Sequence, residues 1–124
     1  MPKPAHRAGP LPALPPNAEW YASDAGGTSP VVEDILRLDA KDRAKLMVYL
    51  TRHLAGSARH GEVVKKLDHE LWEIRHKSRF GALRLLFAQE GGRLVILDVY
   101  VKKSDGSPTD RARRRLQDWR GQRR

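Results

Sequence analysis

The sequence predicts a single α+β domain, and three observations support this prediction. Residues 71–103 contain three apolar runs separated by short breaks that hold glycine, which is the pattern of consecutive antiparallel strands. Residues 29–54 carry apolar side chains at helical spacing, and an arginine-rich helical pattern follows Pro108. A chain of 124 residues with 40% hydrophobic residues suits one core rather than two.

The N-terminal segment is rich in proline, since six of the eight prolines lie in residues 1–16. Proline lacks a backbone N–H and restricts φ, so this segment is expected to form neither a helix nor a central strand. We therefore predict a disordered extension over residues 1–16 and a folded domain over residues 17–124. The short aromatic run at residues 18–23 is the first candidate strand.

Two helices are predicted next. Ser29 is a good N-cap and Pro30 a good first helical residue, so a short helix should run to about Leu38. Asp39 is the next candidate N-cap, and leucines recurring every four residues predict a helix over residues 40–54. Because the break between these helices is short, we expect them to pack as a hairpin on the sheet. Residues 63–67 are predicted to form a turn or a short helix.

Three strands are predicted at residues 71–77, 82–88 and 93–102, with Gly91 and Gly92 in a tight hairpin turn. Side chains alternate across a strand, so each strand has one apolar face, which should lie under the helices. In the last strand this face is expected to hold Val95, Leu97, Val99 and Val101. The opposite faces carry polar residues that we expect to converge: Glu73, Arg75, Arg84, Asp98, Tyr100 and Lys102.

A basic helix is predicted near the end of the sequence. Ser107 and Pro108 form a second cap pair, and the helix should end near Trp119, before Gly121. The chain has 24 Lys and Arg against 15 Asp and Glu, a formal charge of +9, of which residues 102–124 contribute +6. This excess favours an anionic partner such as nucleic acid, an acidic protein or an anionic membrane surface.

The composition also excludes several classes of protein. The absence of cysteine rules out disulfides and thiolate chemistry. No apolar run approaches the roughly 20 residues of a membrane span, and the first residues lack a signal-peptide core. We therefore expect a cytoplasmic protein without a membrane partner. The histidines show no paired ligand spacing, so neither a metal nor another cofactor is predicted.

The predicted polar surface suits chemistry on phosphate. Cleavage of RNA needs proton transfer at two oxygens and cations beside the charge that develops on phosphorus. Arg75 and Arg84 are candidate clamps for this charge because a guanidinium is planar and always protonated. Lys102 is a candidate for holding the phosphate or transferring a proton, and Tyr100 for positioning the 2′-hydroxyl or stacking on a base. Glu73 comes closest to an ordinary general base.

The spacing of these residues leaves other interpretations open. Glu73 and Arg75 could form only a surface ion pair, and Arg84 could pair with Asp98 for a structural reason. A non-catalytic nucleic-acid-binding face and a merely solvated sheet face both remain alternatives to catalysis. His76 falls on the predicted buried side of its strand, which argues against a catalytic role for it.

Several short motifs, taken in order, resemble the phage-derived branch of the RelE/HigB toxin superfamily. They are Lys66-Leu67, Leu71-Trp72-Glu73-Ile74-Arg75, Arg84-Leu85-Leu86-Phe87, Val95-Ile96-Leu97 and Tyr100-Val101-Lys102-Lys103-Ser104, followed by Pro108 and Ala112. The resemblance covers roughly residues 18–119 and implies a RelE-like fold, with an N-terminal helical hairpin on a small antiparallel sheet and a basic C-terminal helix. Two positions depart from the pattern: Asp98 stands where many members carry histidine, and Gly106 where lysine is usual.

The resemblance further implies the toxin of a type II toxin–antitoxin system, a ribosome-dependent mRNA endonuclease that inhibits translation without a metal. Its partners would be mRNA, the ribosome and a cognate antitoxin of the helix-turn-helix type, bound in a hetero-oligomer. The predicted catalytic residues are Arg75, Arg84, Tyr100 and Lys102, and the predicted RNA-binding residues are Lys66, Lys77, Lys103, Arg113 and Arg114. The alternatives are a degenerate toxin that binds nucleic acid or the ribosome without cleavage, and a module whose basic helix binds an acidic antitoxin.

Overall fold

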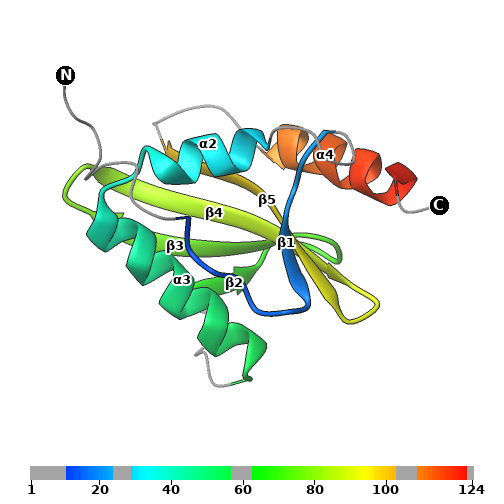
Figure 1. Cartoon of the computed structure of the whole chain (residues 1–124), viewed down its shortest axis with the longest axis horizontal. Helices are drawn as coiled ribbons and strands as arrows, with labels where there is room; N and C mark the ends of the chain where they lie inside the picture. The colour runs from blue at the N-terminus through cyan, green and yellow to red at the C-terminus, as the bar shows by residue number, and fades with distance from the viewer. Residues whose placement is uncertain (1–10, 24–28, 57–62, 103–108, 123–124) are drawn as a thin grey trace.

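The computed structural model describes residues 11–23, 29–56, 63–102 and 109–122. This part of the chain has a mixed α+β architecture, in which a five-stranded sheet carries three helices (Figure 1). The elements in chain order are β1 (Ala18–Trp20), α2 (Pro30–Leu36), α3 (Ala40–Leu54), β2 (Val64–Lys66), β3 (Trp72–Ser78), β4 (Gly81–Glu90), β5 (Arg93–Lys102) and α4 (Thr109–Gln122). The α+β class predicted from the sequence is therefore confirmed.

The sheet has the strand order β1-β5-β4-β3-β2. The predicted meander is present as β3, β4 and β5, and Gly91 and Gly92 have φ values of 58° and 78°, as a type I′ hairpin turn requires. β1 forms one edge and pairs in parallel with β5. The expectation of a small antiparallel sheet is thus wrong in two respects, because the sheet has five strands and one of its pairings is parallel.

The other edge of the sheet is β2, so the prediction of a turn or short helix at residues 63–67 is wrong. Val64 pairs with Ile74 and Lys66 with Trp72, and the backbone N–H of Leu67 donates to the carbonyl of Leu71 at 2.8 Å. Three residues are too few to show an alternating pattern. The strand forms because β3 offers backbone partners along this edge.

The two predicted helices α2 and α3 begin at the predicted caps. The Ser29 hydroxyl accepts a hydrogen bond from the N–H of Val32 at 3.1 Å, and the Asp39 carboxylate accepts one from the N–H of Lys41 at 3.1 Å. Pro30 occupies the first turn of α2, where no backbone donor is needed. Both starts therefore follow from local sequence chemistry.

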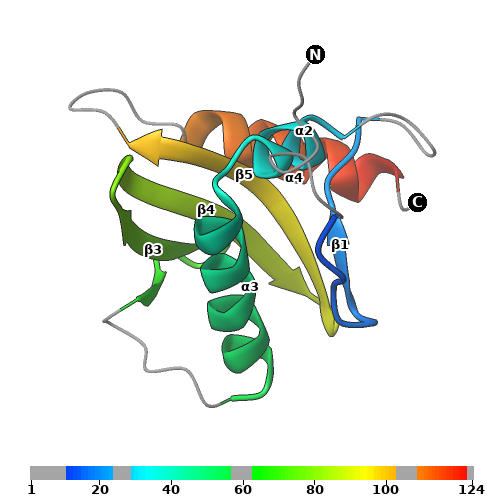
Figure 2. The same cartoon turned by 60° about the vertical axis from the view of Figure 1, so that its left-hand side comes forward.

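The predicted packing of these helices as a hairpin is wrong. α2 packs against β5 and α3 packs against β3, so each contacts a different strand. The two helices run in clearly different directions (Figures 1 and 2). Each helix buries its own apolar side chains against the sheet, Ile35 from α2 and Leu46 and Leu50 from α3. Contact with the sheet, rather than with the neighbouring helix, sets their positions.

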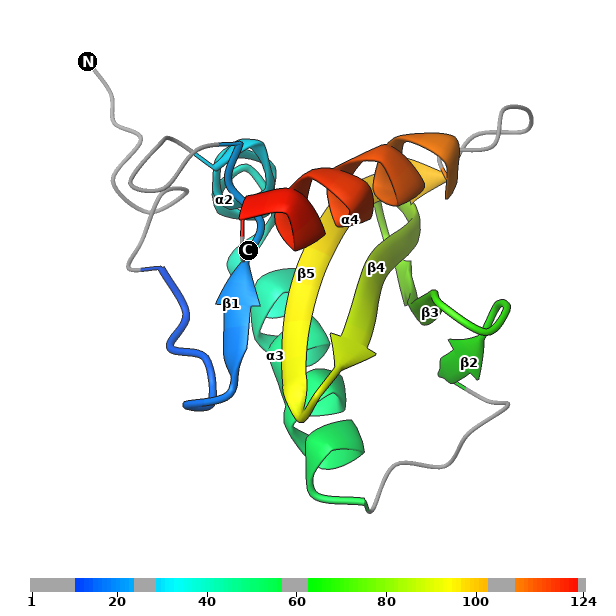
Figure 3. The same ribbon diagram turned by 90° about the vertical axis from the view of Figure 1, so that its right-hand side faces the viewer.

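The C-terminal helix α4 lies on the opposite side of the sheet from α3 (Figure 3). It buries Ala112, Leu116 and Trp119, the thin apolar stripe visible in the sequence. It continues through Gly121 to Gln122 instead of ending near Trp119, and the side-chain amide of Gln122 donates to the carbonyls of Ala22 and Ser23. These contacts with the segment after β1 hold the last turn.

An irregularity in β5 changes the predicted alternation of its side chains. Asp98 pairs with Leu86, whereas Ile96 pairs with Phe87, so Leu97 is an extra residue in the ladder. Val95 therefore lies on the same face as Asp98 rather than with Val99. The predicted shared face is therefore correct for Val99 and Val101, which follow the irregularity, and wrong for Val95, which precedes it.

Some predictions fall on residues that the structure does not describe. The cap pair Ser107-Pro108, Lys103 and residues 1–10 of the predicted extension lie outside the described residues. Residues 11–16 form neither helix nor strand, and Leu14 packs against the core.

Candidate nucleic-acid interface

The sheet face on the α4 side, called the polar face below, carries the polar residues of β3, β4 and β5. The register aligns them in three cross-strand rows. From β3 to β5, the carboxylate row holds Glu73, Leu86 and Asp98; the arginine row holds Arg75, Arg84 and Tyr100; and the lysine row holds Lys77, Ala82 and Lys102. Pairing of neighbouring strands thus brings onto one face all four residues predicted as catalytic, three in the arginine row and Lys102 in the lysine row.

Glu73 links the two arginines of the arginine row. Its Oε1 lies 2.7 Å from Arg75 Nε, and its Oε2 lies 3.4 Å from Arg84 Nε. Glu73 is only 7% exposed, so this is a buried carboxylate rather than the surface ion pair considered from the sequence. Because both carboxylate oxygens face guanidinium groups, Glu73 is better suited to positioning the arginines than to accepting a proton.

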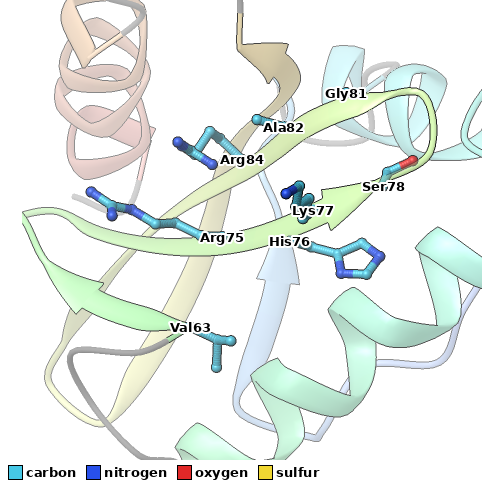
Figure 4. A pocket seen from close by; sticks show the side chains of 8 residues that line it. All are labelled: Val63, Arg75, His76, Lys77, Ser78, Gly81, Ala82 and Arg84. Atoms are coloured by element: carbon cyan, nitrogen blue, oxygen red, sulfur yellow. The ribbon is translucent and has the colours of Figure 1, made fainter.

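The two arginines differ in exposure. The side chain of Arg75 is 43% exposed and that of Arg84 is 14% exposed. Figure 4 shows both side chains on the same side of neighbouring strands, while His76 points away from them. They line a groove of about 490 Å³, and its other lining residues are Val63, His76, Lys77, Ser78, Gly81 and Ala82. The groove leaves guanidinium N–H groups open to an anion.

Asp98 is fully buried and is held by α4. Arg111 donates two hydrogen bonds to its carboxylate, at 2.9 and 2.8 Å, and Arg115 approaches within 3.5 Å. The alternative that Arg84 pairs with Asp98 is therefore wrong, because Arg84 faces Glu73 instead. α4 thus covers the polar face at the carboxylate row, while Arg75, Lys77 and Lys102 stay exposed in the other two rows.

Tyr100 is partly buried in the arginine row. Burial raises the pKa of its phenol, and the nearby carboxylates of Glu73 and Asp98 raise it further, while Arg84 and Arg111 act in the opposite direction. With a pKa above the ordinary value of 10.0, the phenol keeps its proton near neutral pH. Tyr100 can therefore donate a hydrogen bond to an anion at this site.

The structure brings some of the predicted lysines to the polar face and separates others from it. Lys77 and Lys102 are exposed in the lysine row, on either side of Ala82. Lys66 lies opposite Trp72, with its ammonium 5.6 Å from the ring centre, and so points to the face that α3 covers. The structure does not bring Lys66 to the site, and Lys103 lies outside the described residues.

The predicted RNA-binding arginines of α4 are also separated by the structure. Arg113 pairs with Asp68 and lies 3.7 Å from Glu70, while Arg114 is exposed on the helix surface. Sequence reasoning missed Lys65, which is exposed and lies opposite Glu73 in the backbone pairing of β2 with β3. It also missed Arg111, whose spacing of four residues from Arg115 was the available signal for a shared partner.

The two histidines that the structure describes in the core region make structural contacts. His76 Nε2 lies 3.0 Å from Asp42 Oδ1, and the Ser78 hydroxyl donates to the other oxygen of Asp42 at 2.7 Å. His53 Nε2 lies 2.7 Å from Gln89 Oε1. Within the described ranges, no three His, Asp or Glu side chains are grouped so that they could hold a metal ion.

Asp68 provides a test of how α4 is attached. Burial alone would raise the pKa of Asp68, but hydrogen bonds from the N–H groups of Glu70 and Leu71 and from Arg113 lower it from 3.8 to about 2. A lowered pKa in the folded state adds stability above about pH 4, and this stability is lost as the pH falls towards 2.

We therefore expect Asp68→Asn to lose about 1 kcal/mol of unfolding free energy at pH 7, allowing for solvent screening. The difference from wild type should shrink between pH 4 and pH 2, as measured by urea denaturation at each pH. A difference that stayed constant over this range would mean that the charge of Asp68 does not contribute.

The family model described as "Phage derived protein Gp49-like (DUF891)" matches residues 33–117, which include α3, the four strands β2 to β5 and most of α4. No curated protein matches the sequence well enough to count as a relative. In the described segments, no helix combines the length and the apolar character needed to cross a membrane.

Proposed function

The chain belongs to the phage-derived Gp49-like family, a toxin-like family of toxin–antitoxin systems related to RelE and HigB, and on this premise we propose that it is a toxin that cleaves mRNA. The observation that carries the proposal is the pair Arg75 and Arg84, held side by side by Glu73 and open to a groove. Two guanidinium groups at this spacing offer several N–H donors to the oxygens of one phosphate.

The proposed reaction is attack of the ribose 2′-oxygen on the adjacent phosphorus. The 2′-hydroxyl proton passes to solvent, the bond from phosphorus to the 5′-oxygen breaks, and that oxygen takes a proton from the Lys102 ammonium. The products are a 2′,3′-cyclic phosphate and a 5′-hydroxyl. Arg75 and Arg84 stabilise the charge that builds on the phosphate oxygens, which is the largest contribution available here.

Tyr100 completes the proposed site as a hydrogen-bond donor. Its raised pKa keeps the phenol neutral, so it donates to a phosphate oxygen or to the 2′-oxygen and does not act as the base. Glu73 positions the arginines, because both of its oxygens are occupied. The site thus works mainly by orientation and charge, and Lys102 is the side chain that transfers a proton in the proposed reaction.

The family membership also supports the existence of an antitoxin partner. We propose that a cognate antitoxin of the helix-turn-helix type holds the protein inactive in a hetero-oligomer, and that cleavage takes place on mRNA bound to the ribosome, as in the HigB-type branch. The polar face is the natural surface for an inhibitor, since covering the groove beside Arg75 would exclude RNA. An acidic antitoxin segment would match its charge.

The proposal is tested by inducing the protein in growing cells and mapping transcript ends in the same cultures. We expect growth arrest together with new mRNA ends that carry 5′-hydroxyl groups. The same induction with Lys41→Ala, an exposed lysine on α3, serves as the matched control and should behave as wild type. Growth without new ends, despite folded protein, would contradict the proposal.

One observation favours a second candidate, a protein that binds RNA or the ribosome without cutting it. Among the described residues of the polar face, Glu73 is occupied by arginines, and Tyr100 keeps its proton, so neither offers a ready general base. Growth arrest with intact transcripts and salt-sensitive RNA binding would identify this function.

A further inference from the structure

We infer that the lysine row forms a second phosphate subsite, so that the protein takes an extended single strand of RNA running from the arginine row towards the β3–β4 turn. The identity of the ligand rests on the proposed function. The position, direction and single-stranded character of the track come from the geometry of the polar face. The proposed function requires neither this position nor this direction.

The spacing of the rows suits consecutive phosphates. Lys77 is two residues beyond Arg75 on β3, and Lys102 is two residues beyond Tyr100 on β5. Residues two apart on one face of a strand are separated by about 6.6 Å. This spacing is of the same order as the distance between neighbouring phosphates in an extended nucleic-acid strand. A phosphate at the arginine row therefore places the next one at the lysine row.

Ala82 creates the space for this second phosphate. It lies between Lys77 and Lys102 in the row and presents only a methyl group, whereas the equivalent position in the arginine row holds Arg84. Neighbouring strands are about 4.8 Å apart, so the two lysines flank a gap of roughly 10 Å between backbones. The ammonium group of Lys77 can reach over Ala82 to an anion, and Ala82 and Lys77 line the groove (Figure 4).

The structure also fixes the direction of the track. In the opposite direction from the lysine row lies the carboxylate row, where Glu73, Leu86 and Asp98 are all buried. α4 covers this row through Arg111 and Arg115. The helix would block a phosphate there, so the strand continues towards the β3–β4 turn.

A double helix does not fit the same track. α4 lies across β5 (Figure 3), and its Arg111 binds Asp98 in the row next to the arginine row, so the helix limits the width of the open surface there. The groove of about 490 Å³ is of the size of a small-ligand pocket and accommodates one nucleotide rather than a helix. Unpaired RNA is therefore the class of substrate that this surface recognises.

The test uses a fluorescent RNA hexamer with 2′-O-methyl groups, which cannot be cleaved, and measures its Kd over a range of salt concentrations. Lys77→Ala should weaken binding several-fold and reduce the slope of log K against log salt by about 0.7, the value for one phosphate contact with a single strand. Ala82→Leu, which fills the gap between the lysines, should also weaken binding. Lys41→Ala should leave both the Kd and the slope unchanged.

The outcomes separate this inference from the proposed function. If Lys77→Ala and Ala82→Leu bind as Lys41→Ala does, or if a duplex of the same sequence binds more tightly, the track is wrong even where wild type cleaves RNA. If wild type binds with the expected slope but produces no new mRNA ends in cells and cuts no RNA on purified ribosomes, the track stands and the cleavage proposal fails. A wild-type protein that does not bind the hexamer at low salt overturns the track.

Discussion

Arg84→Ala is expected to reduce the rate of RNA cleavage by about 10²- to 10³-fold, the usual cost of removing one group that stabilises charge in a transition state. Arg84 is the less exposed arginine of the pair and is held at a fixed position by Glu73 and by a hydrogen bond to the carbonyl of Leu83. A guanidinium that is already oriented needs no reorganisation when charge develops on the phosphate. We expect Arg75→Ala to have an effect of the same direction.

The measurement is single-turnover cleavage of a labelled RNA on purified ribosomes, with induced growth as the cellular readout. Arg84→Lys separates charge from geometry, because lysine keeps the positive charge but lacks the planar fork; it should restore only a small part of the rate. Thermal unfolding checks that each variant is folded. A folded Arg84→Ala protein that cleaves at the wild-type rate would remove Arg84 from the mechanism.

The largest expected effect on stability comes from removing the two arginines that pair with Asp98. Its carboxylate is fully buried, and its guanidinium partners are Arg111 and Arg115. Replacing both arginines with alanine leaves a buried charge without its partners, which typically costs about 3 to 5 kcal/mol. This is a large part of the 5 to 15 kcal/mol that holds a typical domain folded.

The double variant is compared with Arg114→Ala, an exposed arginine of the same helix, by chemical denaturation. Arg114→Ala should change the unfolding free energy by less than about 0.5 kcal/mol. If the double variant does not fold, the single variant Arg111→Ala gives the same test at a smaller cost. Adding Asp98→Asn to the double variant should recover part of the loss. Equal stability of the double variant and Arg114→Ala would show that α4 is not held through Asp98.

The sequence alone determined the elements whose signals are local. The caps Ser29 and Asp39 determine where α2 and α3 begin, because a side-chain oxygen next to free backbone N–H groups acts within one turn. Gly91 and Gly92 determine the turn between β4 and β5, because a type I′ turn needs positive φ at both central residues, which glycine adopts without strain. Strict alternation then predicts that Arg75, Arg84, Tyr100 and Lys102 share a face.

The tertiary structure decided which charged groups meet. Alternation gives the face of each side chain but not its row, and the row depends on the register between strands far apart in sequence. Arg84 interacts with Glu73 and not with Asp98. The carboxylate of Asp98 is occupied by two arginines from α4, which lies on the same face of the sheet. No local pattern in residues 109–122 indicates which face of the sheet that helix covers.

The same reasoning explains the edges of the fold. β2 is too short for any pattern, and it is a strand only because β3 has free backbone groups beside it. The packing of α2 and α3 on different strands reflects where the sheet offers apolar surface, not the short break between them. Composition and local chemistry thus determined the elements and the basic character of the surface. Long-range pairing and burial decided their arrangement, because these interactions join residues that no sequence window contains together.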